Sequence, residues 1–589
     1  MGARARPRDA RQRPARAPDL PSVPSRRGWL APAAVVLAAL LTYAASLDNG
    51  FVWDDMVIVE RQLVVFDSLG DILSPPRDIP QFSPDYYRPL TIATYLIDRG
   101  LGGERPFAFH LSVVLAHALA SLLLWALAAQ LLADASGAAV GALCAGLLFA
   151  VHPVHSESVA WAAGRSDVLA TAFLLAALVL HGAAPWTWGR SAASGAAAFA
   201  SLAAKEAGVA LYPLVLLRDL LVRPARRPLA DWLRGYAGVA AAGVVYVLLR
   251  RHALGEFVGS TPALAPTHRS PLEIAAAVGT YVGKLLWPWP LNAYIDQLSL
   301  TPAEFAAGLL LIGALLAATW HWRARRDGLP LFALLWIGLT LVPSLAILWK
   351  IPDAPLAERY LYLPSAGFCL LAGDLAARGW ARLPTVTARR VVAAAGVVVL
   401  LLAGAGSALR SRVWHDDIAL WEDTEAKSQV SGMAARNLGT AYQQAGRAAD
   451  ARAAFARALE RHNDPRGLQT IHNNLGTLAM MDGDFAAAQR AYEQALVAAP
   501  DAPDTLFNLG LALLHGGGST PDAARRALPK LQRALALNPH DADVEAGLGQ
   551  VYLILDDRPQ ACEHLHRAEQ LRPSEHTAQG IRQLLSQCE

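Results

Sequence analysis

The chain is poor in charged residues and in cysteine. Asp, Glu, Lys and Arg make up 17% of its 589 residues, whereas hydrophobic residues make up 54%. This composition is too apolar for one soluble domain, and the chain is too long for a single core. Four cysteines are too few for a disulfide scaffold. Cys562 and Cys588 lie in the polar C-terminal part and can pair only if that part faces an oxidising compartment.

The N-terminus lacks the features of a cleaved signal peptide. Residues 1–28 carry eight Arg and five Pro, which predicts a disordered basic cytoplasmic tail. The apolar run 29–47 is long enough to span a bilayer, and no small-residue cleavage site follows it. We therefore expect an uncleaved signal-anchor. The net charge of +3 says little about binding partners, because the basic residues are unevenly placed along the chain. We predict no nucleic-acid partner.

Apolar runs recur through residues 29–410, which predicts an all-α, multi-pass transmembrane domain of about eleven spans. The predicted spans are 29–47, 108–132, 137–153, 168–183, 190–203, 206–222, 234–249, 303–322, 330–348, 360–377 and 390–408. Several are rich in Ala and Gly, which favours tight helix packing. Residues 272–290 contain Lys284 and a Trp-Pro-Trp-Pro run, so we expect a helix in the membrane interface there.

Arginine clusters set the predicted topology. They fall at 218–227, 323–326 and 378–390, which places these loops on the cytoplasmic side with the basic tail. The outer loops are then 48–107, 154–167, 250–302 and 349–359. An odd number of spans puts the soluble region 411–589 on the outer side as well.

The soluble region is a repeat array. An (Asn or Gly)-Leu-Gly triplet recurs at 437–439, 474–476, 508–510 and 547–549, close to the tetratricopeptide period of about 34 residues. This predicts an α-solenoid of four tetratricopeptide repeats over 432–573, with a lead helix near 415–428 and a C-terminal cap near 575–588.

Two adjacent carboxylates, Asp54 and Asp55, follow the first span directly. A neighbouring negative charge and partial desolvation raise one carboxyl pKa, which suits a general base at the outer membrane face. A helix N-cap is the alternative role for either residue. We favour Asp55 as the base.

Histidines gather near the same face. His152, His155 and Glu157 fall within six residues, and could bind a divalent cation, polarise a hydroxyl or form a hydrogen-bonded cluster. A metal site would need a further ligand from elsewhere, so a divalent cation is compatible with the sequence but not required by it. No metal ligands and no cofactor are assigned. His110 lies within the second span, where an ionisable residue faces a cavity or a packing partner.

Four cations lie on the outer side, against the positive-inside bias: Arg88, Arg165, Lys205 and Arg359. One explanation is a bound anion such as a lipid phosphate. The other is a set of salt bridges to the nearby acids, which are Asp55, Glu157, Asp167, Glu206 and Glu358.

Six short motifs occur in order ahead of the repeats. They are Trp-Asp-Asp at 53–55, Tyr-Arg-Pro-Leu at 87–90, His-Pro-Val-His-Ser-Glu at 152–157, Gly-Arg-Ser-Asp at 164–167, Lys-Glu-Ala-Gly at 205–208 and Glu-Arg-Tyr-Leu-Tyr-Leu-Pro-Ser at 358–365. From about residue 29 onward the chain resembles the transmembrane-and-tetratricopeptide O-mannosyltransferases, which belong to the GT-C membrane glycosyltransferases, and their bacterial relatives.

The resemblance implies an inverting sugar transfer from a polyprenyl-phosphate donor to an acceptor hydroxyl on the extracytoplasmic side. Asp54 or Asp55 would be the base. Glu157, with His152 and His155, would assist or shape the acceptor side. Arg88, Lys205 and Arg359 would bind the donor phosphate. The remaining pocket residues would be His110, Arg165, Asp167, Glu206, Glu358 and Tyr360.

The sugar is not fixed by any motif, so mannose is one hexose among several. The Ala- and Arg-rich composition favours a bacterial inner membrane with periplasmic repeats over the endoplasmic reticulum. The repeat groove would hold a polypeptide acceptor or a partner protein. A non-catalytic membrane scaffold that presents the repeats is the alternative. A transporter is disfavoured because the polar residues cluster at the outer surface and not at mid-membrane.

Overall fold

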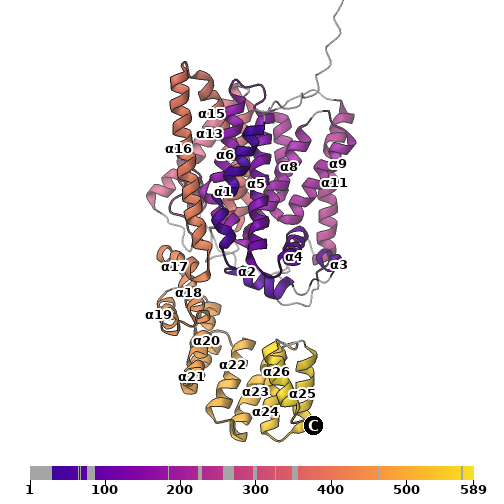
Figure 1. Cartoon of the computed structure of the whole chain (residues 1–589), viewed down its shortest axis with the longest axis vertical. Helices are drawn as coiled ribbons and strands as arrows, with labels where there is room; N and C mark the ends of the chain where they lie inside the picture. The colour runs from indigo at the N-terminus through magenta and orange to yellow at the C-terminus, as the bar shows by residue number, and fades with distance from the viewer. Residues whose placement is uncertain are drawn as a thin grey trace, which may run out of the picture.

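The computed structural model shows an all-helical chain, as the sequence predicts (Figure 1). The structure describes residues 29–63, 66, 68–75, 86–183, 185–222, 228–255, 271–295, 301–325, 327–347, 356–461, 463–571 and 575–588. Over these ranges it contains no β-strand, and a single antiparallel bridge joins Ile295 to Leu356. The predicted N-terminal tail lies outside the described residues.

Every one of the predicted spans coincides with a helical segment. These are α1 (Leu30–Thr42), α5 (Pro106–Leu131), α6 (Ala138–Val151), α8 (Arg165–Gly182), α9 (Trp188–Ala204), η7 (Glu206–Ala210) with α10 (Leu211–Leu217), α11 (Leu229–Leu254), α13 (Pro302–Arg325), α14 (Gly328–Ile347), α15 (Tyr362–Arg382) and α16 (Val386–Ser411).

Seven helices within the described ranges are long and apolar enough to cross a membrane. An eighth is obtained if α6 and the short helix after its 45° bend form one span. The chain is thus a multi-pass membrane protein. The predicted total of eleven spans also counts shorter helices such as α1 and α10, and this total stays a prediction. The interfacial position of α12 (Pro271–Leu286) also stays a prediction.

Small residues bring the bundle helices into close contact. A Cβ added to Gly141 of α6 would lie 2.6 Å from the carbonyl oxygen of Gly373 in α15. The two backbones could not approach this closely with larger side chains, as expected for helices packed within a membrane bundle.

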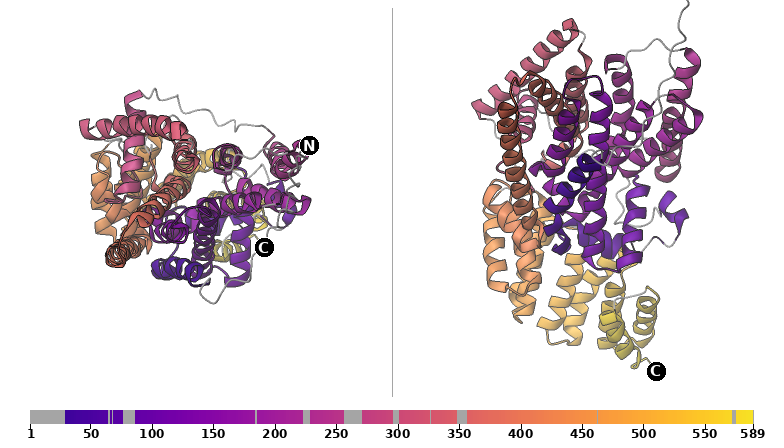
Figure 2. Two further views of the ribbon diagram at one scale, coloured as in Figure 1. Left: turned by 90° about the horizontal axis from the view of Figure 1, so that it is seen from above. Right: turned by 45° about the horizontal axis from the view of Figure 1, so that its top comes forward.

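The described helices of the predicted outer loops lie toward the end of the bundle that carries the repeats (Figure 1). They include α2 (Asp54–Met56), η3 (Val57–Gln62), α3 (Leu69–Leu73), α4 (Pro89–Gly102), α7 (Ser156–Ala160) and η9 (Glu358–Leu361). The repeats stay at this end when the view is turned (Figure 2). The chain reaches them through α16 and η10 (Arg412–Trp414).

The repeat region consists of a lead helix, four antiparallel helix pairs and a cap. Its helices are α17 (Asp417–Lys427), α18 (Met433–Gln444), α19 (Ala448–Leu459), α20 (Pro465–Met481), α21 (Phe485–Ala498), α22 (Pro503–Gly516), α23 (Pro521–Leu537), α24 (Ala542–Ile554), α25 (Arg558–Gln570) and α26 (Glu575–Leu585).

The recurring triplet glycines allow the two helices of a repeat to pack together. A Cβ on Gly439 would lie 2.6 Å from the ring of Phe455, and one on Gly476 would lie 2.6 Å from the ring of Tyr492. A disulfide joins Cys562 of α25 to Cys588, which follows the cap helix. The described part of the array therefore has the helical pairing that the repeat period predicts.

Candidate active site

The Trp53–Asp55 triplet lies where the first outer loop, the second outer loop and the repeat region meet. The backbone N–H of Trp53 donates to Oδ1 of Asp417 in α17 at 2.8 Å. The indole ring of Trp53 stacks on Trp161 at 5.2 Å and meets Trp421 edge-on at the same distance. Trp53 thus links the membrane domain to the lead helix of the repeats.

Asp55 is a structural link between two loops. Its side chain is 1% exposed, and its carboxylate accepts from the N–H of Val52 at 3.2 Å and of Ala163 at 2.8 Å. Burial raises the pKa of Asp55 to about 8, although the two N–H donors and Arg165 act in the opposite direction. Each oxygen accepts one backbone N–H, and the buried residue does not line the neighbouring cavity, so its carboxylate is poorly placed to receive a substrate proton.

Asp54 lies beside it but faces a cavity of about 400 Å³. Among the described residues, no group donates a hydrogen bond to its carboxylate. Surrounding protein atoms raise the pKa of Asp54 by desolvation, and Arg359 opposes this shift. The cavity is lined by Asp54, Val57, Ile58, Leu63, Phe66, Tyr86, Arg88, Thr91, Ile92, Tyr95, Ala163 and Ser166. Of the two carboxylates, Asp54 and not Asp55 faces the cavity.

Arg88 is the cation in the lining of this cavity. Its Nε and Nη2 donate to Oε2 of Glu206 at 3.0 and 2.9 Å, and its guanidinium lies 4.4 Å from the centre of the Tyr86 ring. Burial alone would lower the pKa of Arg88, but Glu206 and Asp167 together raise it. Arg88 is therefore a fixed positive charge in the wall of the cavity that Asp54 also lines.

Lys205 and Arg359 form two further ion pairs close by. Lys205 Nζ lies 2.7 and 2.6 Å from the two carboxylate oxygens of Asp167. Arg359 Nη1 and its backbone N–H donate to Glu157 at 2.5 and 2.9 Å. Tyr360 lies between the cations, with its ring centre 5.5 Å from Lys205 Nζ and 4.9 Å from the Arg359 guanidinium.

The cations of these pairs act on one another. Burial lowers the pKa of Lys205, Asp167 raises it, and Arg88 and Arg359 lower it further. The salt bridges that the sequence offered as one explanation are thus present for Arg88, Lys205 and Arg359. Of the three cations, Arg88 lines the same cavity as Asp54, and Arg359 acts on the charge of Asp54.

Two of the predicted pocket residues have structural partners. Arg165 is 1% exposed, and it donates to Asp98 at 2.5 Å and to the Phe109 carbonyl at 3.1 Å. Glu358 is buried and accepts from Lys284 at 2.8 Å and from the N–H of Asn292 at 2.7 Å. Both hold loops in place around the cavity and do not line it.

The predicted histidines are buried, and none of them lines the cavity. His110 contacts the Gly50 carbonyl at 3.2 Å, His152 the Leu285 carbonyl at 3.0 Å, and His155 the Ser365 hydroxyl at 2.7 Å. Within the described ranges, no group of three or more His, Cys, Asp or Glu side chains is arranged to hold a metal ion. The contacts fit the hydrogen-bonded cluster that the sequence also allowed.

Sequence reasoning did not single out several residues of this region. Asp98 is the acid that fixes Arg165, and Thr91, Tyr95 and Ser166 line the cavity beside Asp54. Asp98 lies in α4 beyond the motifs, so only its charge within an apolar helix could have marked it. Asp417 lies far along the chain from the residue it contacts, and no sequence signal joins the two.

The comparisons with known proteins agree with both halves of the prediction. The tetratricopeptide-repeat family model matches residues 430–501. Protein O-mannosyl-transferase Tmtc3 of Drosophila melanogaster is 25% identical over 572 residues, which cover 82% of this chain and 60% of the relative. Protein O-mannosyl-transferase TMTC4 of Mus musculus is 25% identical over 471 residues, which cover 69% of this chain and 63% of the relative.

A shorter match has higher identity. Protein O-mannosyl-transferase TMTC2 of Homo sapiens is 35% identical over 143 residues, 23% of this chain and 17% of the relative. The chain spans less than two thirds of the length of these relatives. Among solved structures, a crystal structure of MamA covers 26% of the chain at 18% identity with a TM-score of 0.23. The predicted resemblance to the protein O-mannosyl-transferases is confirmed.

Proposed function

We propose that this protein, a relative of the protein O-mannosyl-transferases, is an integral-membrane glycosyltransferase. It moves a hexose from a polyprenyl-phosphate donor to a hydroxyl of a polypeptide or glycan acceptor. The observation that supports this most strongly is the Asp54 carboxylate, which accepts no hydrogen bond from the described residues and faces a cavity beside Arg88 and two further ion pairs. A base next to several cations is what such a transfer needs.

The chemistry is a single displacement. The acceptor hydroxyl gives its proton to Asp54 while its oxygen attacks the anomeric carbon of the sugar. The bond between that carbon and the phosphate oxygen breaks, and its electron pair leaves with the polyprenyl phosphate. The configuration at the anomeric carbon is inverted. A positioned general base typically contributes a factor of about 10²–10⁴ to such a rate.

Each cation has a role in binding the phosphate. Arg88 lines the cavity and is the first candidate contact, while Lys205 and Arg359 extend the positive region. A bound phosphate would share these cations with their carboxylates through charge-assisted hydrogen bonds. Glu157 contacts Arg359 through both the side chain and the backbone, so we assign Glu157 to positioning that arginine.

The site lies on the repeat side of the bundle, and we propose that this side is extracytoplasmic. The disulfide between Cys562 and Cys588 supports this orientation, because disulfides persist in oxidising compartments. Together with the composition, this favours a bacterial inner membrane with periplasmic repeats.

The test is a transfer assay with the full chain in liposomes. Wild-type protein should transfer labelled hexose from a polyprenyl-phosphate donor to a peptide or glycan acceptor, with mannose and other hexoses tried in parallel. Asp54→Asn should lose this transfer. If the wild-type protein transfers no sugar from any of these donors, the non-catalytic scaffold is the better account.

A further inference from the structure

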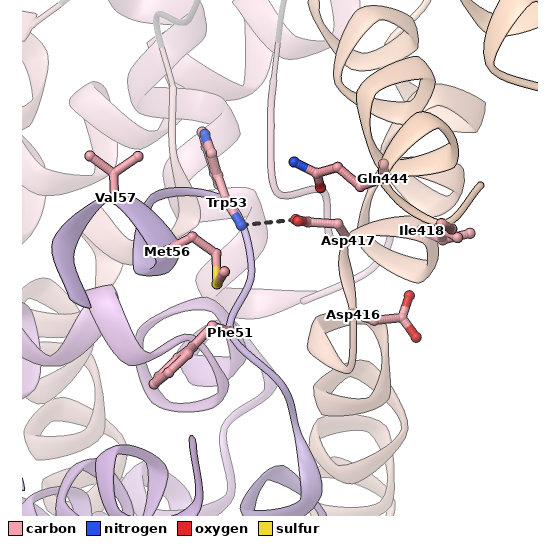
Figure 3. A pocket seen from close by; sticks show the side chains of 10 residues that line it. Phe51, Trp53, Met56, Val57, Asp416, Asp417, Ile418 and Gln444 are labelled. Carbon is pink, nitrogen blue, oxygen red and sulfur yellow. Dashed lines mark hydrogen bonds between the residues drawn. The ribbon is translucent and has the colours of Figure 1, made fainter. Parts of the chain in front are cut away.

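A second cavity of about 630 Å³ adjoins the segment that carries Asp54. Figure 3 shows Phe51, Trp53 and Met56 of the first outer loop on one side of it, and Asp416, Asp417 and Gln444 on the other. The remaining lining residues are Val57, Ile418, Ala441 and Ala445. We call this space the junction cavity, because the membrane domain and the first repeat each form one wall.

The junction cavity and the candidate active-site cavity share one lining residue. Val57 lines both cavities, and Trp53 and Asp54 are neighbours in sequence that line one cavity each. Met56 and Val57 keep 39% and 40% of their surface exposed although they are apolar. A ligand in the junction cavity would therefore cover apolar surface within a few residues of the proposed base.

The character of the junction cavity differs from that of the active-site cavity. Its described lining is apolar apart from Asp416, Asp417 and Gln444, and it contains no lysine or arginine. Two carboxylates without a lining cation repel a phosphate group, so the charge is wrong for the sugar donor. The same charge favours a neutral or basic ligand.

The position next to the repeats indicates the kind of ligand. One wall is formed by the lead helix α17 and by the end of α18, the first helix of the tetratricopeptide array. Pockets of some 300–1,000 Å³ hold small ligands or a few side chains of a larger one. The cavity therefore lies between the first repeat and the segment that carries Asp54.

We propose that the junction cavity binds the acceptor polypeptide beside the residue that receives the sugar. The acceptor enters as an extended segment with apolar and basic side chains next to its Ser or Thr, and the hydroxyl passes Val57 to reach Asp54. The proposal rests on the proposed glycosyltransferase function and adds the binding site and the chemical class of its acceptor.

The first test changes Gln444, an exposed residue of the cavity wall that has no part in the proposed chemistry. Gln444→Trp should fill part of the cavity and raise the KM for an unfolded peptide with a central Thr flanked by Leu and Lys by about tenfold. The kcat should stay near the wild-type value. Transfer to a small soluble alcohol, which does not need the cavity, should be unchanged.

Met481→Trp is the matched control. Met481 ends α20 at the position that Gln444 has in α18, it is 68% exposed, and it does not line the cavity. This control should leave the KM at the wild-type value. A peptide with Glu in place of Lys should bind more weakly to the wild-type protein. An unchanged KM in Gln444→Trp, or a preference for the Glu peptide, would overturn the proposal.

A binding experiment separates the failure of this proposal from failure of the proposed function. A photoreactive benzophenone side chain at position 444 should cross-link the Leu- and Lys-containing peptide, whereas the same side chain at position 481 should not. Cross-linking by a protein that transfers no sugar would reject the enzymatic function and keep the peptide site. Transfer without cross-linking at 444 would reject the peptide site and keep the enzyme.

Discussion

At the scale of single residues, Asp54 and Asp55 show how neighbouring identical side chains acquire different roles. Successive residues of a helical turn point about 100° apart. Here this difference sends one carboxylate into the cavity and the other toward the N–H groups of Val52 and Ala163. Sequence reasoning singled out the pair and favoured Asp55 as the base. It could not foresee the different surroundings of the two carboxylates, because these depend on where Ala163 of another loop lies.

Removal of the Asp55 carboxylate should destabilise the protein. Asp55→Ala leaves the buried N–H of Val52 and the partly buried N–H of Ala163 without their acceptor, and a buried unsatisfied group costs about 1–3 kcal/mol. Asp54→Asn, one residue earlier, should stay within about 0.5 kcal/mol of wild type, because its carboxylate accepts no hydrogen bond from the described residues. Thermal unfolding in detergent measures both, and equal stability of the two variants would contradict the assigned roles.

The pH dependence of transfer should report the environment of Asp54. A general base works only when ionised, so the rate falls as pH drops through its folded-state pKa. Desolvation raises the pKa of Asp54 above its usual value of 3.8, which moves this acid limb to higher pH. Arg359 acts in the opposite direction. In Arg359→Gln, the pH below which kcat/KM falls should therefore be higher than in the wild-type protein. A shift of this pH to a lower value would refute the role of Arg359.

At the scale of structural elements, the repeats and the membrane domain are joined at Trp53. This residue has φ of +55°, in a region that residues other than Gly rarely adopt. Such backbone conformations persist only where surrounding contacts hold them. The Asp417 carboxylate and the rings of Trp161 and Trp421 supply these contacts. The repeat array was predictable because its period is local in sequence, whereas this contact between distant segments was not.

Asp417→Ala should loosen this junction. It removes the acceptor of the Trp53 N–H and one support of its backbone, at a cost of about 1–3 kcal/mol. Hydrogen exchange should rise in residues 50–57 and in α17 but remain at the wild-type level in α22 to α25. Asp416→Ala, which removes the N-cap of α17 and a contact with His415 but leaves the Trp53 contact in place, is the control. Unchanged exchange at 50–57 in Asp417→Ala would show that the contact does not hold the segment.

At the scale of the whole molecule, the proposed site and the repeats lie at the same end of the bundle (Figure 1). Alternating apolar runs and arginine-rich loops predicted this arrangement, because each span reverses the side on which the next loop emerges. The partners within the site were not predictable. Arg88 and Glu206, for example, come from loops separated by several spans, and only the packing of α4 and α9 brings them together.

The side of the membrane on which the repeats lie can be read from two cysteines. In right-side-out vesicles, a membrane-impermeant maleimide should label Cys562 and Cys588 only after reduction, because the two form a disulfide. Cys369 is fully buried in the bundle and should stay unlabelled in the native protein. A variant with serine at both 562 and 588 provides the background. Labelling restricted to inside-out vesicles would place the repeats in the cytoplasm.

The central claim is that Asp54 is the base of a sugar transfer, and chemical rescue tests it most directly. Asp54→Ala should reduce transfer from the polyprenyl-phosphate donor by about 10²–10⁴-fold. Formate, a carboxylate small enough for the cavity of about 400 Å³, should restore part of the rate. Formate should not restore the rate of a variant lacking Asp55. Wild-type transfer by Asp54→Ala without formate would contradict the account.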